Sequence, residues 1–139
     1  MQEGTLNAPG YPEETTPPEP DVFAAQCPTR QLLDRIADKW SVLILTTLGD
    51  GEMRFNALKR RVSGISQKML SQTLRSLERD GLVQRSVFAT IPVTVSYAIT
   101  PLGRELLDAL RAMIDWAQRR LPQVAEAQRD FDARMAEAG

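Results

Sequence analysis

The sequence predicts a mainly α-helical fold with a small β component (α+β), made of short helices, a two-stranded hairpin and a long C-terminal helix. Apolar residues recur at helical spacing in four segments between residues 28 and 80, which favours amphipathic helices. Two β-branched runs follow at 82–88 and 93–99, as is typical of a hairpin. Thr100-Pro101 then precedes an apolar stripe about 20 residues long, which predicts a capped helix.

The length and composition predict one folded domain with tails. The chain has 139 residues, which suits a single domain. Residues 1–22 are acidic and hold five of the nine prolines, which predicts a disordered tail. We expect the folded domain over residues 23–121 and a polar helix or tail over residues 122–139.

The net charge of −1 conceals an uneven distribution. Residues 1–26 carry five acidic and no basic residues, whereas residues 27–100 carry eleven basic and six acidic ones. Residues 101–139 carry six basic and seven acidic residues. The excess of positive charge in the middle segment favours an anionic partner such as nucleic acid.

The composition argues against several classes of function. The chain has one cysteine and no histidine, so the commonest general base is absent and a transition-metal site would need carboxylates alone. We therefore expect no enzyme, no metal site and no cofactor. No apolar run reaches the roughly 20 residues of a membrane span, and no secretory signal is visible. The expected location is the cytoplasm.

The first two helices are expected at residues 28–37 and 39–48. Leu32, Leu33 and Ile36 form the apolar stripe of the first helix. The second helix is apolar on most of its sides, which predicts that it lies at the centre of the core.

A short extended piece, Met53-Arg54-Phe55, precedes a third helix that we expect over residues 56–62. The last part of this helix carries Lys59, Arg60 and Arg61. Their charges suit the negative end of a helix.

The segment over residues 66–80 predicts a fourth helix with two contrasting faces. Ser66 is a suitable N-cap, and a glycine follows the segment. Leu70, Leu74 and Leu77 recur at helical spacing and should pack inward. The opposite face carries almost no acid and consists of amides, a hydroxyl and cations: Gln67, Lys68, Ser71, Gln72 and Arg75.

Two helices joined by a turn and followed by a hairpin are typical of a winged helix-turn-helix. In that fold the second helix enters the major groove of double-stranded DNA, and the hairpin is the wing. Arg75 could pair with guanine, the glutamines could bind adenine or phosphate, and the cations of the third helix would contact flanking phosphates. The residues expected at DNA are Ser66, Gln67, Lys68, Ser71, Gln72 and Arg75, with Lys59, Arg60 and Arg61 from the preceding helix and Arg85 and Thr90 from the wing.

The C-terminal helix is longer than a small winged domain needs, so its apolar stripe predicts an interface between two copies of the chain. A homodimer would place two DNA-binding helices roughly 34 Å apart, about one turn of DNA. Pro122 lies where this helix should break or kink. The residues expected at the dimer interface are Leu102, Leu106, Leu110, Met113, Ile114, Ala117 and Leu121, with Leu32 from the first helix.

Several short motifs lie in the order found in one known family. They are Cys27-Pro28, Asp38-Lys39-Trp40, Arg54-Phe55-Asn56-Ala57-Leu58, Gly64 to Ser71, Leu77 to Val83, and Tyr97 to Gly103. On these motifs the chain, from Cys27 to about Leu121, resembles the HxlR family of bacterial winged helix-turn-helix regulators, which are relatives of the MarR group.

The resemblance implies a dimeric transcriptional repressor or activator that occupies a palindromic operator and pairs through its first and last helices. We expect a repressor. Several family members sense electrophiles or oxidants through a cysteine at the position of Cys27, which implies modification of this thiol as one possible switch. A small-molecule effector held between the long helix and the winged body is another. A winged domain used only for protein–protein contact is the remaining alternative.

The predicted wing departs from the family pattern. Such wings often carry a Pro-Pro-basic turn and an acidic residue before the tyrosine, whereas this chain has Ile91-Pro92-Val93, and Ser96 before Tyr97. We therefore expect wing contacts to DNA that are weaker, or that are made by Thr90, Thr94 or Arg85.

Overall fold

The computed structural model describes residues 23–139, so the tail predicted over residues 1–22 lies outside the described residues. The chain divides into two compact parts, one ending at Arg35 and the other running from Ile36 to Gly139. Helix α1 (Pro28–Ile36) belongs mainly to the first part. It has no buried residue.

The second part holds all the other elements and confirms the predicted fold class. Its core is built around α2 (Lys39–Leu48), as the sequence predicted. Ile44, Leu45 and Leu48 of this helix are fully buried. Asp38 caps the helix, because its carboxylate accepts hydrogen bonds from the first backbone N–H groups.

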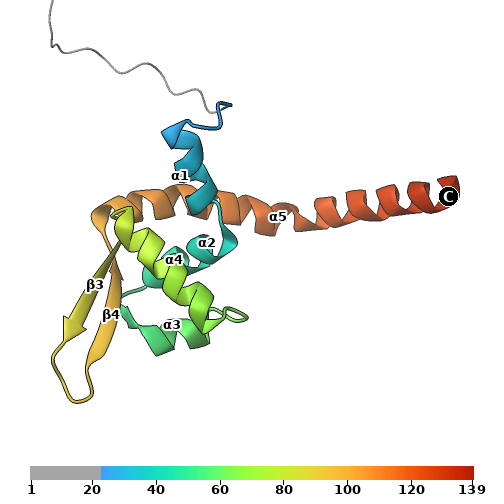
Figure 1. The fold of residues 1–139 in the computed structure, drawn as a ribbon. Helices are drawn as coiled ribbons and strands as arrows, with labels where there is room; N and C mark the ends of the chain where they lie inside the picture. The colour runs from blue at the N-terminus through green and yellow to red at the C-terminus, as the bar shows by residue number, and fades with distance from the viewer. Residues whose placement is uncertain (1–22) are drawn as a thin grey trace, which may run out of the picture. The chain divides into compact units, whose positions relative to one another are not determined.

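Helices α3 (Phe55–Arg61) and α4 (Gln67–Arg79) pack on α2. The turn between them passes through Gly64, whose φ of 89° favours glycine. Figure 1 shows α4 lying across α2, with α3 near the N-terminal end of α4.

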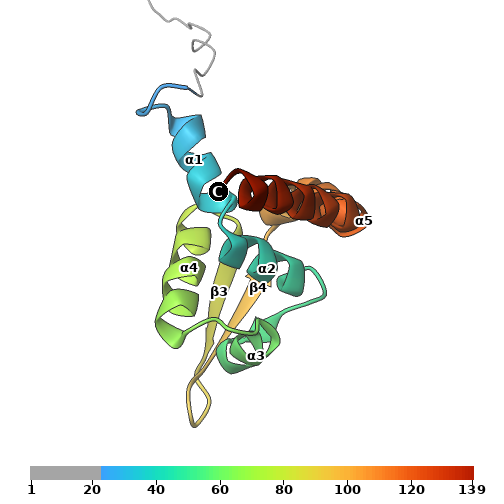
Figure 2. The ribbon, with the colours of Figure 1, turned by 90° about the vertical axis from the view of Figure 1, so that its right-hand side faces the viewer.

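The sheet has three strands. β3 (Val83–Phe88) and β4 (Thr94–Ile99) form the predicted antiparallel hairpin. The segment expected only to be extended contains a short strand, β2 (Met53–Arg54), which pairs with β4 so that Met53 lies opposite Tyr97. The strand order is therefore β2-β4-β3, and the hairpin extends beyond the core as the wing (Figure 2).

A cluster of hydrogen bonds around Thr100 joins α4, the sheet and α5 (Pro101–Ala138). The hydroxyl of Thr100 donates to the carbonyl of Gly81 at 2.6 Å, and it accepts from the backbone N–H of Gly103 at 3.0 Å. The backbone N–H of Thr100 donates to the carbonyl of Leu82 at 3.1 Å. The end of α4, the base of the wing and the start of α5 are thus fixed to one another.

Of the break or kink predicted at Pro122, the structure contradicts the break. Helix α5 continues as one helix of 38 residues through Pro122 to Ala138. A proline inside a helix loses one backbone hydrogen bond. The neighbouring segment is rich in Ala, Gln, Glu and Arg, which are strong helix formers and offset that loss. The C-terminal half of α5 extends away from the other elements of this part (Figure 1).

We predict that Gly103→Ala destabilises the domain by about 1–3 kcal/mol, the usual cost of overpacking. A Cβ at this position would collide with the carbonyl oxygen of Leu82 and would lie 2.8 Å from Cγ1 of Ile99. Urea denaturation measures the loss, with Gly139→Ala as a control, since a Cβ there would meet nothing closer than 3.4 Å. Equal urea midpoints for the two variants would contradict the close packing of Gly103 against Leu82.

Candidate nucleic-acid interface

Helix α4 is delimited by local signals at both ends. The Ser66 hydroxyl accepts a hydrogen bond from the backbone N–H of Met69 at 3.0 Å, as an N-cap does. At the other end Gly81 adopts a φ of 79°, and the N–H of Leu82 donates to the carbonyl of Leu77 at 2.9 Å. The caps agree with the bounds predicted from the sequence.

The two predicted faces of α4 are separated as expected. Leu70, Leu74 and Leu77 are buried in the core cluster, and Thr73 is buried beside them. The sequence did not identify Thr73, because a lone threonine at an inward position gives little signal. The five residues predicted on the outer face of α4 are all exposed: Gln67, Lys68, Ser71, Gln72 and Arg75.

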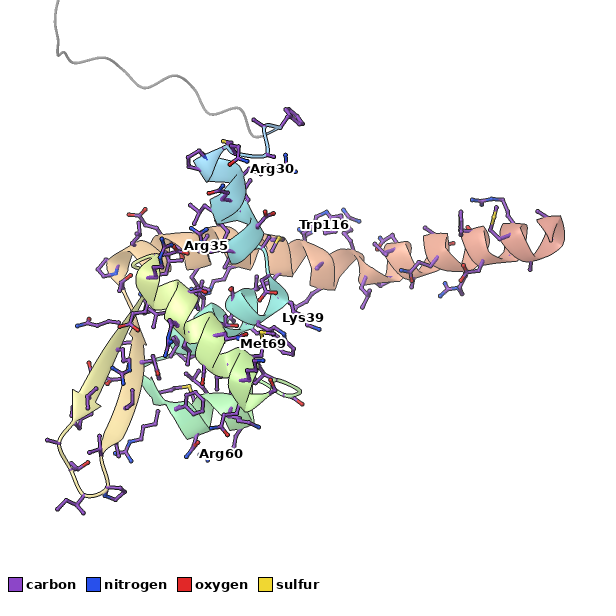
Figure 3. All side chains as sticks on the ribbon, viewed as in Figure 1. Arg30, Arg35, Lys39, Arg60, Met69 and Trp116 are labelled. Atoms are coloured by element: carbon purple, nitrogen blue, oxygen red, sulfur yellow. The ribbon has the colours of Figure 1, made fainter. Side chains whose placement is uncertain are left out.

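The basic end of α3 contributes further charge. Lys59, Arg60 and Arg61 are all exposed in the last turn of the helix. Figure 3 shows Arg60 extending from α3. None of the three has an ion pair with another described residue, so their charges are available to an anionic partner.

The two wing residues predicted at DNA differ in their surroundings. Arg85 is exposed and lies opposite Tyr97 across the β3–β4 pair. The hydroxyl of Thr90 donates to the carbonyl of Pro92 at 2.8 Å, within the wing tip. The tip also displays Ile91, which is fully exposed.

These elements meet at one end of the second part of the chain. Figures 1 and 2, which differ by a turn about the vertical axis, both show α3, the N-terminal end of α4 and the wing tip at the lower end. We call this the α3–wing end. A single duplex could therefore contact all three elements at once.

The predicted dimer residues fall into two groups. Leu110 is 7% exposed and belongs to the core of its own protomer, and Leu106 and Ile114 are half-buried against that core. These three stabilise the protomer itself. The others are exposed: Leu32 on α1, and Leu102, Met113, Ala117 and Leu121 on α5.

The exposed apolar stripe of α5 continues beyond the predicted interface. Val124, Phe131 and Met135 are all exposed. They follow Leu121 at intervals of three, seven and four residues, which places them on one side of the helix. Trp116 also projects from α5 (Figure 3). The sequence did not predict this continuation, because a break or kink was expected at Pro122 and a polar helix or tail after it.

Cys27 precedes α1 and is 6% exposed. Its backbone N–H donates to the carbonyl of Ala24 at 3.1 Å, and its carbonyl accepts from the N–H of Gln31 at 3.0 Å. Within residues 23–139, no group of three or more His, Cys, Asp or Glu side chains is arranged to hold a metal ion. In the same range no helix is long and apolar enough to cross a membrane.

Comparison with known proteins shows what the chain is similar to. The model of the HxlR-like helix-turn-helix family matches residues 35–125. The uncharacterized HTH-type transcriptional regulator YtfH of Escherichia coli (strain K12) is 42% identical over 106 residues, which are 76% of this chain and 84% of the relative.

Two solved structures extend the comparison to the fold. The putative transcriptional regulator ytfH from Salmonella typhimurium is 45% identical with a TM-score of 0.75, over 81% of this chain and 99% of that one. The redox regulator HypR in its oxidized form is 38% identical with a TM-score of 0.62, over 67% of this chain and 96% of that one.

Proposed function

The chain belongs to the HxlR-like helix-turn-helix family of DNA-binding transcriptional regulators, and we propose that it binds a palindromic operator as a homodimer and represses transcription by occluding a promoter. The main support for sequence-specific binding is the outer face of α4, whose polar and cationic side chains are exposed while the leucines of the same helix are buried. If this face of α4 were only solvent-exposed surface, there would be no reason for the basic end of α3 and the wing to lie at the same end of the domain.

The proposed roles follow from side-chain chemistry. Gln67 and Gln72 present amides that can hydrogen-bond both donor and acceptor groups of adenine, and Ser71 is short enough for close approach of α4 to the groove. Lys59 and its neighbours in α3 would contact the phosphate backbone of the flanking DNA, which supplies affinity without sequence preference.

We predict that Gln72→Ala weakens binding to the operator by about 1–3 kcal/mol and leaves binding to random duplex nearly unchanged, because Gln72 would contact a base. Lys59→Ala should instead weaken both duplexes alike and reduce the slope of log K against log salt by roughly 0.9. Fluorescence anisotropy measures both effects, on an operator defined by footprinting.

Arg129→Ala is the matched control, since it removes one exposed charge from the C-terminal half of α5. It should leave both affinities unchanged. If the wild-type protein does not bind random duplex at about 50 mM salt, DNA binding through this surface is wrong, and a module for protein–protein contact becomes the better interpretation.

The homodimer is supported by the exposed apolar surface of α5. Met113, Leu121, Phe131 and Met135 are each at least half-exposed along this helix. Within residues 36–139, the C-terminal half of α5 extends away from the other elements (Figure 1). Burying one such side chain contributes about 1.5–3 kcal/mol, so a second copy of the helix would gain several such contributions.

We predict that Leu121→Glu raises the dissociation constant of the dimer roughly tenfold or more, because a charge would replace a leucine that the dimer would bury. Gln123→Glu introduces the same side chain two residues away, off the stripe, and should leave the constant unchanged. Sedimentation equilibrium measures both, and circular dichroism checks that each protomer stays folded. A wild-type protein that remains monomeric at micromolar concentration would refute the dimer.

Cys27 is the proposed redox switch, as supported by the similarity to the redox regulator HypR. Two Cys27 thiols from two protomers would lose two protons and two electrons to an oxidant such as diamide and form one disulfide bond. Because Cys27 is 6% exposed, the surrounding segment must open before the thiol can react.

We predict that diamide lowers the operator affinity of the wild-type protein and that dithiothreitol restores it. Cys27→Ser should bind the operator with unchanged affinity in both conditions, because the serine hydroxyl cannot form a disulfide. Anisotropy measures the affinities, and non-reducing electrophoresis detects the cross-link. Release of DNA by oxidised Cys27→Ser would show that this thiol is not the switch, which would favour a bound effector.

A further inference from the structure

A polar pocket of about 360 Å³ lies between α4 and the wing. Ser71, Arg75 and Glu78 line it from α4, and Arg85 and Tyr97 line it from the two strands of the hairpin. We call it the α4–wing pocket. Its volume lies within the range of small-ligand sites, and none of the chemistry described above uses it as a whole.

The fold itself brings these side chains together. Ser71, Arg75 and Glu78 are spaced by four and three residues, so they share one face of α4. Arg85 and Tyr97 are directly opposed across the antiparallel β3–β4 pair, so both lie on the same side of the sheet. Two arginines, Arg75 from the helix and Arg85 from the wing, therefore line one pocket.

The charged side chains in the pocket form no ion pairs with other described residues and leave a net positive charge. Among residues 23–139, neither Arg75, Glu78 nor Arg85 has an ion pair with another residue. Two cations and one carboxylate leave an excess of one positive charge. The guanidinium groups offer several N–H donors in a planar geometry that matches an oxyanion.

The hydroxyl of Tyr97 is a second indication of a ligand. Tyr97 is 9% exposed and lines the pocket, yet within the described part of the chain its hydroxyl forms no hydrogen bond. A hydroxyl that lines a pocket and has no partner in the protein is available to donate a hydrogen bond to an oxygen atom in that pocket. A ligand oxygen in the pocket would supply that partner.

We propose that the α4–wing pocket binds an oxyanion, held by the guanidinium groups of Arg75 and Arg85 and by the hydroxyls of Ser71 and Tyr97. The oxyanion is either a backbone phosphate of bound DNA or a free phosphate-like anion that acts as an effector. The first source rests on the proposed DNA-binding function, whereas the second does not. In both cases Arg75 contacts phosphate and not the guanine that the sequence suggested for it.

Inorganic phosphate is the probe, titrated into DNA-free protein at constant ionic strength against chloride. The Nε–Hε resonances of Arg75 and Arg85 should shift together and saturate. Arg85→Gln should weaken phosphate binding about tenfold or more, since it removes a charged donor. Tyr97→Phe keeps the ring and should weaken binding several-fold.

Two further variants make the test specific. Glu78→Gln should bind phosphate more tightly, because it removes the only negative charge that residues 23–139 contribute to the pocket lining. Arg79→Gln is the control, since Arg79 is exposed on the same helix but does not line the pocket, and it should bind like the wild type. Equal phosphate affinities for Arg85→Gln, Tyr97→Phe and Arg79→Gln, or no saturable shift in the wild type, would overturn the proposal.

A second titration distinguishes the two sources. If a DNA phosphate is the occupant, saturating random duplex will displace inorganic phosphate from the pocket. If the occupant is a free anion, phosphate will bind the protein–duplex complex with unchanged affinity. The first titration contains no DNA. A protein that binds phosphate but not duplex would therefore refute the proposed function and still support the anion site.

Discussion

The burial of one face of α4 is the constraint on which the rest of the structure depends. Leu70, Leu74 and Leu77 are at most 2% exposed, and each such side chain contributes about 1.5–3 kcal/mol when buried. A rotation of the helix by one residue position would expose this face and bury cations. The hydrophobic effect, which has no specificity for DNA, therefore determines which side chains of α4 a duplex can meet.

The hydrogen bonds of Thr100 extend this constraint to the other functional surfaces. They join the C-terminal end of α4, at Gly81, to the base of the wing and the first turn of α5. Gly103 permits the close approach, since a side chain there would meet the carbonyl oxygen of Leu82. The angle between two α5 helices in a dimer would consequently set the angle between their two α4 helices, which is how a signal at the dimer surface would reach the α3–wing end.

Local signals in the sequence predicted local structure well. They did not predict features that depend on residues distant in the chain. The periodicity of the α4 leucines and the caps Ser66 and Thr100 sufficed for both helices. The strand β2 is two residues long, too short to show alternation, and its pairing with β4 joins segments about 40 residues apart.

Helix α5 shows a different limit. A rule about proline predicted a break or kink at Pro122, but the helix continues without a break because the surrounding residues are strong helix formers. Leu110 carried the same apolar signal as Leu121, yet one lies in the core and the other is exposed, because only tertiary packing decides which part of a long stripe faces its own domain. The α4–wing pocket likewise needs Arg85 beside Arg75, a contact that no spacing along the chain encodes.

The position of Arg85 also explains how a wing without a cationic tip can serve a DNA-binding domain. Arg85 is the only Lys or Arg between residues 82 and 99, and it lies near the middle of β3, not in the turn. The tip presents Ile91 instead, which cannot attract phosphate. The positive charge of the wing therefore lies close to that of α4, and Arg85 and Arg75 can bind the same anion. A cation at the wing tip would instead bind a different anion, farther from α4.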